Sequence, residues 1–265
     1  MTKTSRTPLT ERRLLKLARP VIIIAALIAT WQIVVTVTGA PKYMLPAPYE
    51  VWLTLIKRHD VLLDHARYTI AETVIGLFAG AALGALAALP MALFATVRFW
   101  LMPILLVSQA IPFFALAPLL VLWLGFGLGS KIAMAALIIF FPVTVAFFDG
   151  LSRTEPGFLD LARTMGASRW RLLTHVRLPA ALPSFASGFR VATAVAPIGA
   201  VIGEWVGSSH GLGYLMLHAN ARVQIDMVFA CLLILCAFSI TQYFLVDRAL
   251  RAALPWQPDS LKPAK

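Results

Sequence analysis

The chain has 265 residues, of which 60% are hydrophobic and only 13% are charged. A soluble domain is about 45–50% apolar and about 25% charged, so this composition excludes an ordinary soluble protein. The net charge of +11 would suit a nucleic-acid partner, but the basic residues lie at the ends of apolar runs, where they set orientation in a bilayer. We therefore expect no nucleic-acid binding.

Six apolar runs are close to the ~20 residues that cross a hydrocarbon core of ~30 Å. In chain order they cover roughly residues 20–38, 68–96, 101–124, 131–150, 187–206 and 227–249. Helices satisfy their own backbone hydrogen bonds in lipid, so we predict an all-α integral membrane protein with about six transmembrane helices. The first run follows a basic start, but it is longer than the apolar part of a signal peptide and lacks a cleavage motif, which predicts an uncleaved span.

The basic residues also predict the orientation and the domain limits. Most Lys and Arg residues fall in segments that lie on the same side of the membrane as the two termini. Because basic residues concentrate on the cytoplasmic side, both termini are predicted to lie in the cytoplasm. We divide the chain into a basic N-terminus (1–19), a transmembrane domain (20–250) with an internal cytoplasmic loop at about 151–186, and a C-terminal tail (251–265).

The second run carries Gly76, Gly80 and Gly84 at intervals of four, on one face of the expected helix. Small residues in this pattern let two helices approach closely. They predict one of two roles. The first is a seam for dimerisation or gating, and the second, which we favour, is ordinary packing within the chain.

Ionisable side chains inside apolar runs are costly and usually face a cavity or a partner. Glu72 and Asp149 lie near the expected span ends. Each therefore has either a solvated or helix-end role or a role on a translocation path. Asp149 can also pair with Arg153, one turn further on.

Glu204 and Gln109 are the other polar residues within the runs. Glu204 lies toward the outer end of the fifth run beside Trp205, so it is either part of an outer gate or path or an interfacial anchor. Gln109 precedes Ile111-Pro112 and is expected to line a pore or to bridge two helices.

The last run contains Cys231 and Cys236, and a connection before it contains several polar residues. Five residues apart on a helix, the two cysteines point in different directions, so they are expected to be small buried residues without a disulfide. The outer connection reads GLGYLMLHANA, a short expected helix, and its His210 and His218 lack the tight spacing of a metal site. We expect no metal ligands in the chain.

Four arginines interrupt the apolar pattern between the fourth and fifth runs, at positions 163, 169, 171 and 177. Gly166 suits a left-handed helix end, and Ser168 can cap a new helix that begins at Arg169. We expect Pro179 and Pro183 to stop this helix before the chain re-enters the membrane.

Within this expected helix, Trp170, Leu173 and Val176 should share an apolar face. The segment is therefore a helix-turn-helix that either fixes topology against anionic lipid or docks onto another protein.

This segment resembles the signature loop of the inner-membrane permeases of ATP-binding cassette (ABC) importers. That signature has a Glu-Ala-Ala run, a glycine, nine residues, an aliphatic residue, any residue and Leu-Pro. DLARTMGASRWRLLTHVRLP matches the spacing from Gly166 through Val176 to Leu178-Pro179, while Asp160 replaces the first Glu. The resemblance implies a type I importer permease fold and these ATPase-coupling residues: Asp160, Ala162, Arg163, Gly166, Ala167, Ser168, Trp170, Leu178 and Pro179.

Most of the chain after residue 40 resembles the permease branch that serves nitrate, sulfonate, taurine and thiamine pyrimidine precursors. IGAVIGEWVGSS, GLGYLMLHANARVQ and LVDRALRAALPW are most similar to the hydroxymethylpyrimidine importers. The resemblance implies a small polar solute delivered by a periplasmic or extracellular binding protein. Tyr214, His218 and Arg222 would contact that protein, and Gln109, Glu204 and Glu72 would line the path.

The resemblance also implies the partners and the location. The glycine-rich GFGLGSK lacks the spacing of a phosphate-binding loop, so the chain is not expected to be an enzyme. ATP and Mg²⁺ would be bound by separate ATPase subunits, and this chain would hold no cofactor. A second permease copy, in a homodimer by default, would complete the path in the bacterial inner membrane. The alternative class is an ion-coupled secondary transporter, but the paired repeats typical of that class are not visible.

Overall fold

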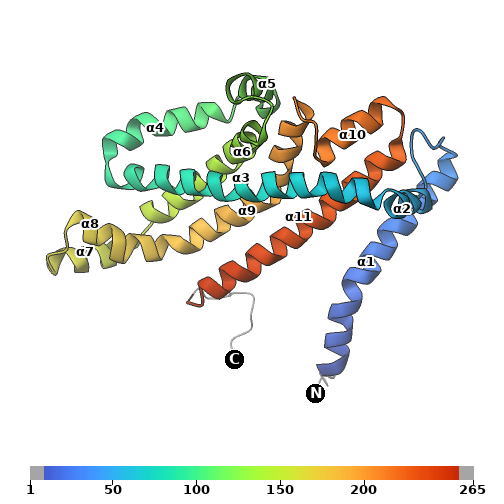
Figure 1. Ribbon diagram of the computed structural model, residues 1–265. Coiled ribbons are helices and arrows are strands. Elements are labelled where there is room, and N and C mark those ends of the chain that lie inside the picture. The colour runs from blue at the N-terminus through green and yellow to red at the C-terminus, as the bar shows by residue number, and fades with distance from the viewer. Residues whose placement is uncertain (1–8, 257–265) are drawn as a thin grey trace, which may run out of the picture. The chain divides into compact units, whose positions relative to one another are not determined.

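The computed structural model describes residues 9–256, and it describes side chains from residue 18 onward apart from residue 20. The predicted cytoplasmic ends at residues 1–8 and 257–265 therefore lie outside the described residues. The described chain consists of helices joined by short loops (Figure 1). In order they are α1 (Leu9–Thr38), α2 (Pro48–Lys57), α3 (His59–Leu93), α4 (Ala95–Ser108), α5 (Phe113–Leu124), α6 (Leu128–Ser152), α7 (Pro156–Thr164), α8 (Arg169–Leu172), a π-helical turn (Leu173–Arg177), α9 (Leu178–Trp205), α10 (Leu212–Ala221) and α11 (Ile225–Ala253).

Five stretches of the described helices are long and apolar enough to cross a membrane. They are Val21–Thr38, His59–Leu93, Leu128–Ser152, Arg169–Trp205 and Ile225–Ala253. A sixth span arises only if α4 and α5 are counted together, and these two helices meet at an angle of 104°. The prediction of about six spans is confirmed.

The continuous span predicted for 101–124 is wrong, because the chain breaks between Ser108 and Phe113. Pro112 explains the break, since a proline pushes the residue before it out of the helical region.

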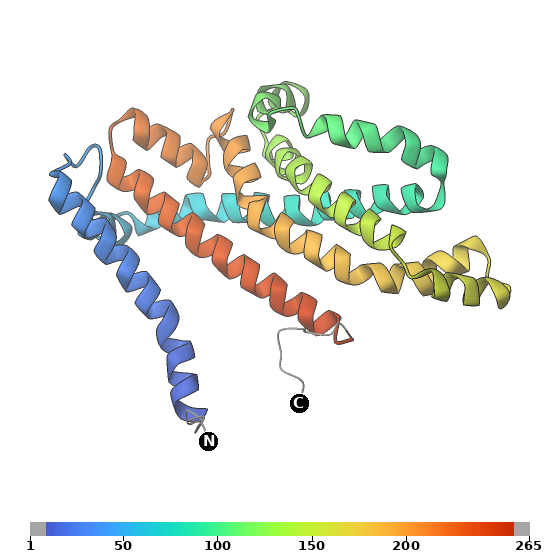
Figure 2. The ribbon, with the colours of Figure 1, turned by 180° about the vertical axis from the view of Figure 1, so that it is seen from behind.

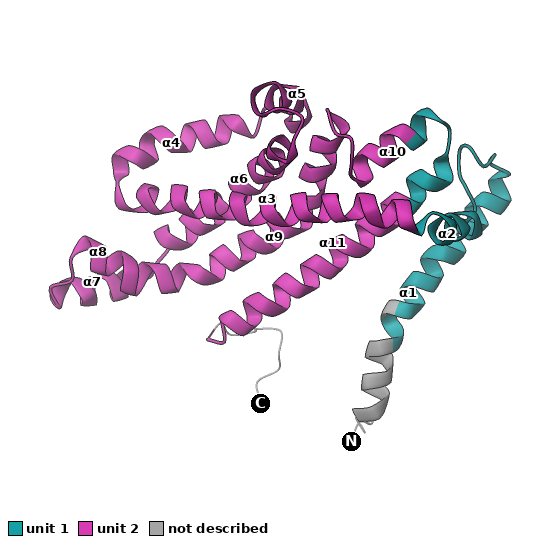
Figure 3. Cartoon of the chain, in the orientation of Figure 1, with its two compact units in different colours: residues 1–59, 219–230 teal, residues 60–218, 231–265 magenta. Residues whose placement is uncertain are grey.

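The chain forms two compact units (Figure 3). The first contains residues 1–59 and 219–230, and the second contains residues 60–218 and 231–265. In the first unit, Trp31 at α1 donates from Nε1 to the carbonyl oxygen of Pro46 at 3.1 Å and stacks on Phe229 with ring centroids 5.3 Å apart. These contacts hold α1 against the loop that leads into α2.

The core of the second unit lies where α3, α6 and α9 meet (Figures 1 and 2). Gly76, Gly80 and Gly84 of α3 all face α6, and a β-carbon at Gly80 would lie 2.6 Å from the carbonyl oxygen of Ala136. A β-carbon at Gly199 of α9 would lie equally close, 2.6 Å, to the Cα atom of Ala135. The glycines therefore serve packing within the chain, and the reading as a dimer seam is wrong.

Two further expectations need correction. Cys231 is buried as expected, but Cys236 is exposed, because the two point in different directions around α11 and only one of them meets other helices. The fifth span begins at Arg169, far before the predicted residue 187, since the helix does not stop at the prolines. The expected short helix in the outer connection is confirmed as α10.

Candidate functional site

The arginine segment contains the helix end that the sequence predicts at Gly166. The backbone of Gly166 is left-handed, with φ of +78°, and its N–H donates to the carbonyl oxygen of Arg163 at 2.9 Å. The N–H of Ala167 donates to the carbonyl oxygen of Ala162 at 3.0 Å. This pair of bonds is the Schellman arrangement, which satisfies carbonyl groups that the end of α7 would otherwise leave free.

The next helix starts as predicted at Arg169. The hydroxyl oxygen of Ser168 accepts a hydrogen bond from the N–H of Arg171 at 3.3 Å, which caps α8. The turn between α7 and α8 is therefore fixed from both sides by hydrogen bonds, and it presents a rigid corner.

The predicted stop at Pro179 and Pro183 is wrong. Pro179 lies directly after the π-turn at the start of α9, and Pro183 is accommodated inside the helix. The wide π-turn precedes them, and helical structure runs from Arg169 to Trp205 over 37 residues. The segment after Gly166 is therefore the end of a membrane-spanning helix, and Leu178 and Pro179 lie within that helix.

The apolar face predicted for Trp170, Leu173 and Val176 does not form. Leu173 is buried in the core with Ala88 and Phe147, whereas Trp170 is 64% exposed. The five-residue π-turn starts at Leu173, so the ordinary helical spacing no longer applies there.

An exposed apolar surface nevertheless exists on this corner, formed by residues of α7 and the turn that line one hollow. It consists of Phe158, Leu161 and Met165, with exposed fractions of 60%, 60% and 79%. Asp160 and Arg163 form an ion pair at 2.8 Å beside it.

A second cluster lies at the other end of α9 and centres on Glu204, which is 1% exposed. Its Oε1 atom accepts a hydrogen bond from Thr69 Oγ1 at 2.5 Å, and its Oε2 atom accepts one from the N–H of Gly213 at 2.5 Å. The N–H of Leu212 donates to Thr69 Oγ1 at 2.8 Å. Glu204 and Thr69 thus satisfy N–H groups at the start of α10, which would otherwise be buried without partners.

Glu72 and Lys131 complete this buried cluster. Glu72 is 2% exposed within α3, so the solvated, helix-end reading of this residue is wrong. Lys131 is 1% exposed and lies close to both carboxyl groups. Its ammonium group donates to the carbonyl oxygens of Phe126, Gly127 and Gly207, the last two at 3.0 Å.

Sequence reasoning missed both Thr69 and Lys131. The usable signal for Lys131 was its place in the first turn of an apolar helix, directly after a glycine-rich loop. Nothing local distinguishes Thr69 from other threonines in membrane helices. The part of Glu204 in a translocation path stays a prediction, since the structure shows only its buried hydrogen bonds.

The remaining candidates lie at the surface of the chain. Gln109 is exposed at the break between α4 and α5 and lines a hollow of about 500 Å³ with Phe113 and Ser187. Asp149 pairs with Arg153 at 3.5 Å, as predicted. Tyr214 stacks on His218 with ring centroids 4.1 Å apart on α10.

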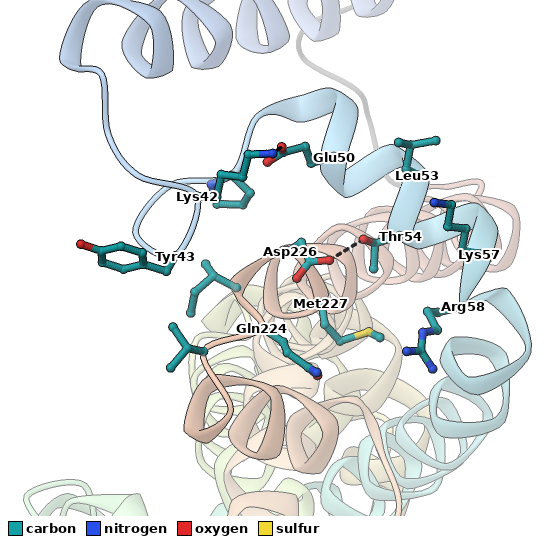
Figure 4. A pocket seen from close by; sticks show the side chains of 13 residues that line it. Lys42, Tyr43, Glu50, Leu53, Thr54, Lys57, Arg58, Gln224, Asp226 and Met227 are labelled. Carbon is teal, nitrogen blue, oxygen red and sulfur yellow. Dashed lines mark hydrogen bonds and ion pairs between the residues drawn. The ribbon is translucent and has the colours of Figure 1, made fainter.

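Arg222 is exposed just after α10, in the first unit, and that unit holds a pocket of about 600 Å³ (Figure 4). Asp226 accepts a hydrogen bond from Thr54 Oγ1 at 2.6 Å at its centre, and Lys42 pairs with Glu50 at its edge. The hydrogen bond and the charge of Glu50 raise the pKa of the Lys42 ammonium above its ordinary value. Both acids of this pocket therefore already have partners within the chain.

The long apolar helices define a multi-pass membrane protein, and the α7–α8 corner interrupts them between α6 and α9. The sequence model of the family described as "binding-protein-dependent transport system inner membrane component" matches residues 80–254 of the chain. The chain belongs to this family of ABC importer permeases, and it is a transport subunit, not an enzyme. Permeases of this family work with ATPase subunits and solute-binding proteins.

Two relatives and one solved structure show how far the likeness extends. A probable ABC transporter permease of Haemophilus influenzae is 52% identical over 88% of this chain and 95% of its own length. The formylaminopyrimidine transport permease ThiX of Halalkalibacterium halodurans is 36% identical over 90% of this chain and 95% of its own. An inward-facing structure of the methionine ABC transporter MetNI matches with a TM-score of 0.65 at 20% identity, over 74% of this chain and 97% of that one.

Proposed function

We propose that the corner formed by α7, Gly166 and α8 is the part of this permease on which an ATPase subunit acts. The observation that carries the proposal is that this corner is exposed, apolar and fixed by hydrogen bonds, and that it continues without interruption into α9. A partner that grips Phe158, Leu161 and Met165 would therefore move a transmembrane helix directly. ATP and Mg²⁺ would bind to that partner and not to this chain.

The two clusters suggest how the movement would reach the other side of the membrane. Helical structure from Arg169 to Trp205 spans about 55 Å at 1.5 Å per residue. Figures 1 and 2 both place α7 and α8 at one end of α9 and the start of α10 at the other. Because Glu204 holds the start of α10, a displacement of α9 would also displace the surface that carries Tyr214 and His218, our proposed contact for the solute-binding protein.

The proposed arrangement has both termini and the corner in the cytoplasm, with two copies of the chain about a two-fold axis. The excess of basic residues on the side of the termini supports this orientation. A second copy is proposed because the five or six spans of one chain are few for an enclosed path. Gln109 beside its hollow and Glu204 and Glu72 near the outer side are the proposed path residues.

A cysteine crosslinking experiment tests the docking proposal. In a Cys236→Ser background, which removes the exposed native thiol, Met165→Cys places a thiol at the most exposed large apolar residue of the corner. With the purified ATPase present, we expect a crosslinked permease–ATPase product. Phe126→Cys is the matched control, because Phe126 is 75% exposed in the loop between α5 and α6. A product from the control alone, or from neither variant, contradicts the proposal.

The proposed solute is a pyrimidine precursor of thiamine of the hydroxymethylpyrimidine type. The likeness to a permease named for formylaminopyrimidine supports this choice. In a transporter reconstituted with its binding protein, we expect the pyrimidine to stimulate ATP hydrolysis and to accumulate in vesicles. Taurine, another sulfonate and nitrate serve as comparison solutes. Stimulation by one of these, without any by the pyrimidine, would overturn the solute and leave the permease role intact.

A further inference from the structure

Four arginines surround a hollow of about 480 Å³ on the inner side of the α7–α8 corner. They are Arg98 of α4, Arg163 of α7, Arg169 of α8 and Arg177 of the π-turn. Its lining contains no Asp or Glu. This hollow is distinct from the exposed apolar surface of Phe158, Leu161 and Met165, none of which lines it.

The positive charge in this hollow is only partly balanced by the chain. Arg163 pairs with Asp160, whereas Arg98, Arg169 and Arg177 make no ion pair with any residue between 18 and 256. Arg177 donates from Nη1 to the carbonyl oxygen of Ala92 at 3.1 Å, but its buried Nε–H finds no acceptor in the described part of the chain. Arg98, Arg163 and Arg169 are exposed and Arg177 is half-buried, so solvent screens part of their mutual repulsion, and an anion bound among them would remove the rest.

The position of the hollow indicates which kind of anion it would meet. It is lined by the end of α3 (91–93), by Arg98 in the first turn of α4 and by Ser152 at the end of α6. The ends of membrane-spanning helices lie at the level of the lipid headgroups. Phe94, Phe99 and Trp100 beside the hollow are 54%, 71% and 68% exposed, and aromatic side chains concentrate at this same level.

We propose that this hollow binds the headgroup phosphate of an anionic phospholipid from the surrounding leaflet. Guanidinium groups match phosphate oxygens with paired, charge-assisted hydrogen bonds, and basic pockets between membrane helices favour such headgroups. The bound phosphate would join Arg98, at the α3–α4 turn, to Arg169 of α8. The lipid would thereby hold the corner against the membrane helices, a consequence that rests on the docking role proposed above, although the binding itself does not.

Lipid retention by the full transporter complex tests the proposal. The complex is reconstituted with equal amounts of phosphatidylglycerol and phosphatidylcholine, washed with detergent, and its retained lipids are measured by mass spectrometry. We expect the wild-type complex to retain phosphatidylglycerol selectively. In Arg98→Gln/Arg169→Gln, loss of two charge-assisted contacts should reduce that retention by roughly tenfold or more. Arg153→Gln, which removes an exposed arginine outside the hollow, should retain the lipid as the wild type does.

Three results would overturn the proposal. The first is equal retention of the two lipids by the wild type, and the second is an equal loss in Arg153→Gln. The third is displacement of the lipid by inorganic phosphate, because the hollow would then be a general anion site. Each arginine variant is also made in the Met165→Cys/Cys236→Ser background, and its crosslinking to the ATPase is measured beside its lipid retention. Loss of lipid selectivity with crosslinking retained therefore supports this proposal, whereas loss of crosslinking alone concerns only the docking role.

Discussion

Replacing Gly166 with valine is expected to reduce solute uptake by roughly tenfold or more while the protein still inserts into the membrane. A β-carbon at this position meets no atom within 4 Å, so the substitution creates no steric clash with the rest of the chain. The cost lies in the backbone, because φ of +78° is a conformation in which β-branched residues are genuine outliers. Valine would therefore disrupt the Schellman turn and misplace the corner, which we propose to be the ATPase contact.

Two further variants make this result interpretable. Gly157→Val places the same side chain in α7 of the same segment, where a β-carbon also meets nothing within 4 Å and φ is not left-handed, so uptake should be little changed. Gly166→Asn keeps a residue that tolerates the left-handed region and should retain more uptake than valine. Uptake and solute-stimulated ATP hydrolysis are measured in reconstituted vesicles. Full activity of Gly166→Val would remove the turn from the mechanism.

Replacing Glu204 with alanine is expected to destabilise the folded protein by about 2–6 kcal/mol, because two buried donors would each be left without an acceptor at a cost of about 1–3 kcal/mol. The hydroxyl of Thr69 and the N–H of Gly213 would lose their acceptor, and Lys131 would lose a neighbouring carboxyl group. A water molecule in the vacated space could recover part of this cost. The start of α10 should then separate from α3 and α9.

Unfolding in detergent and the yield of membrane-inserted protein measure this effect. Glu204→Gln keeps an acceptor for Thr69 but places an amide against the N–H of Gly213, so it should fall between the wild type and alanine. Glu155→Ala is the control, since Glu155 is exposed and its side chain does not cap α7. If Glu204→Ala were as stable as this control but lost uptake, Glu204 would act on the translocation path and not as an anchor.

The features that the sequence predicted well depend on neighbouring residues. The left-handed Gly166, the cap at Ser168 and the pair of Asp149 with Arg153 each follow from chemistry within four residues. The apolar runs likewise gave the approximate number of spans, because hydropathy reports directly on transfer into lipid.

The features that could not be predicted depend on residues far apart in the chain. Thr69 and Glu204 are 135 positions apart, and only the packing of α3 against α9 brings them together. The persistence of the helix through Pro179 and Pro183 likewise depends on packing, since Leu173 and Ala181 on this stretch are both buried in the same core. Considered from the local sequence alone, the two prolines are expected to end the helix, but tertiary contacts outweigh that tendency here.

The three carbonyl groups held by Lys131 have a consequence for engineering. Two of them come from the loop before α6 and one from the loop after α9, so the Lys131 side chain joins its own loop to a carbonyl group 76 positions further along the chain. A chimera that takes only one of these loops from a relative with another solute would place loops from two different proteins around Lys131, and its hydrogen bonds to them would be mismatched. Exchange of specificity between such relatives should therefore transplant both loops together with the lysine that binds them.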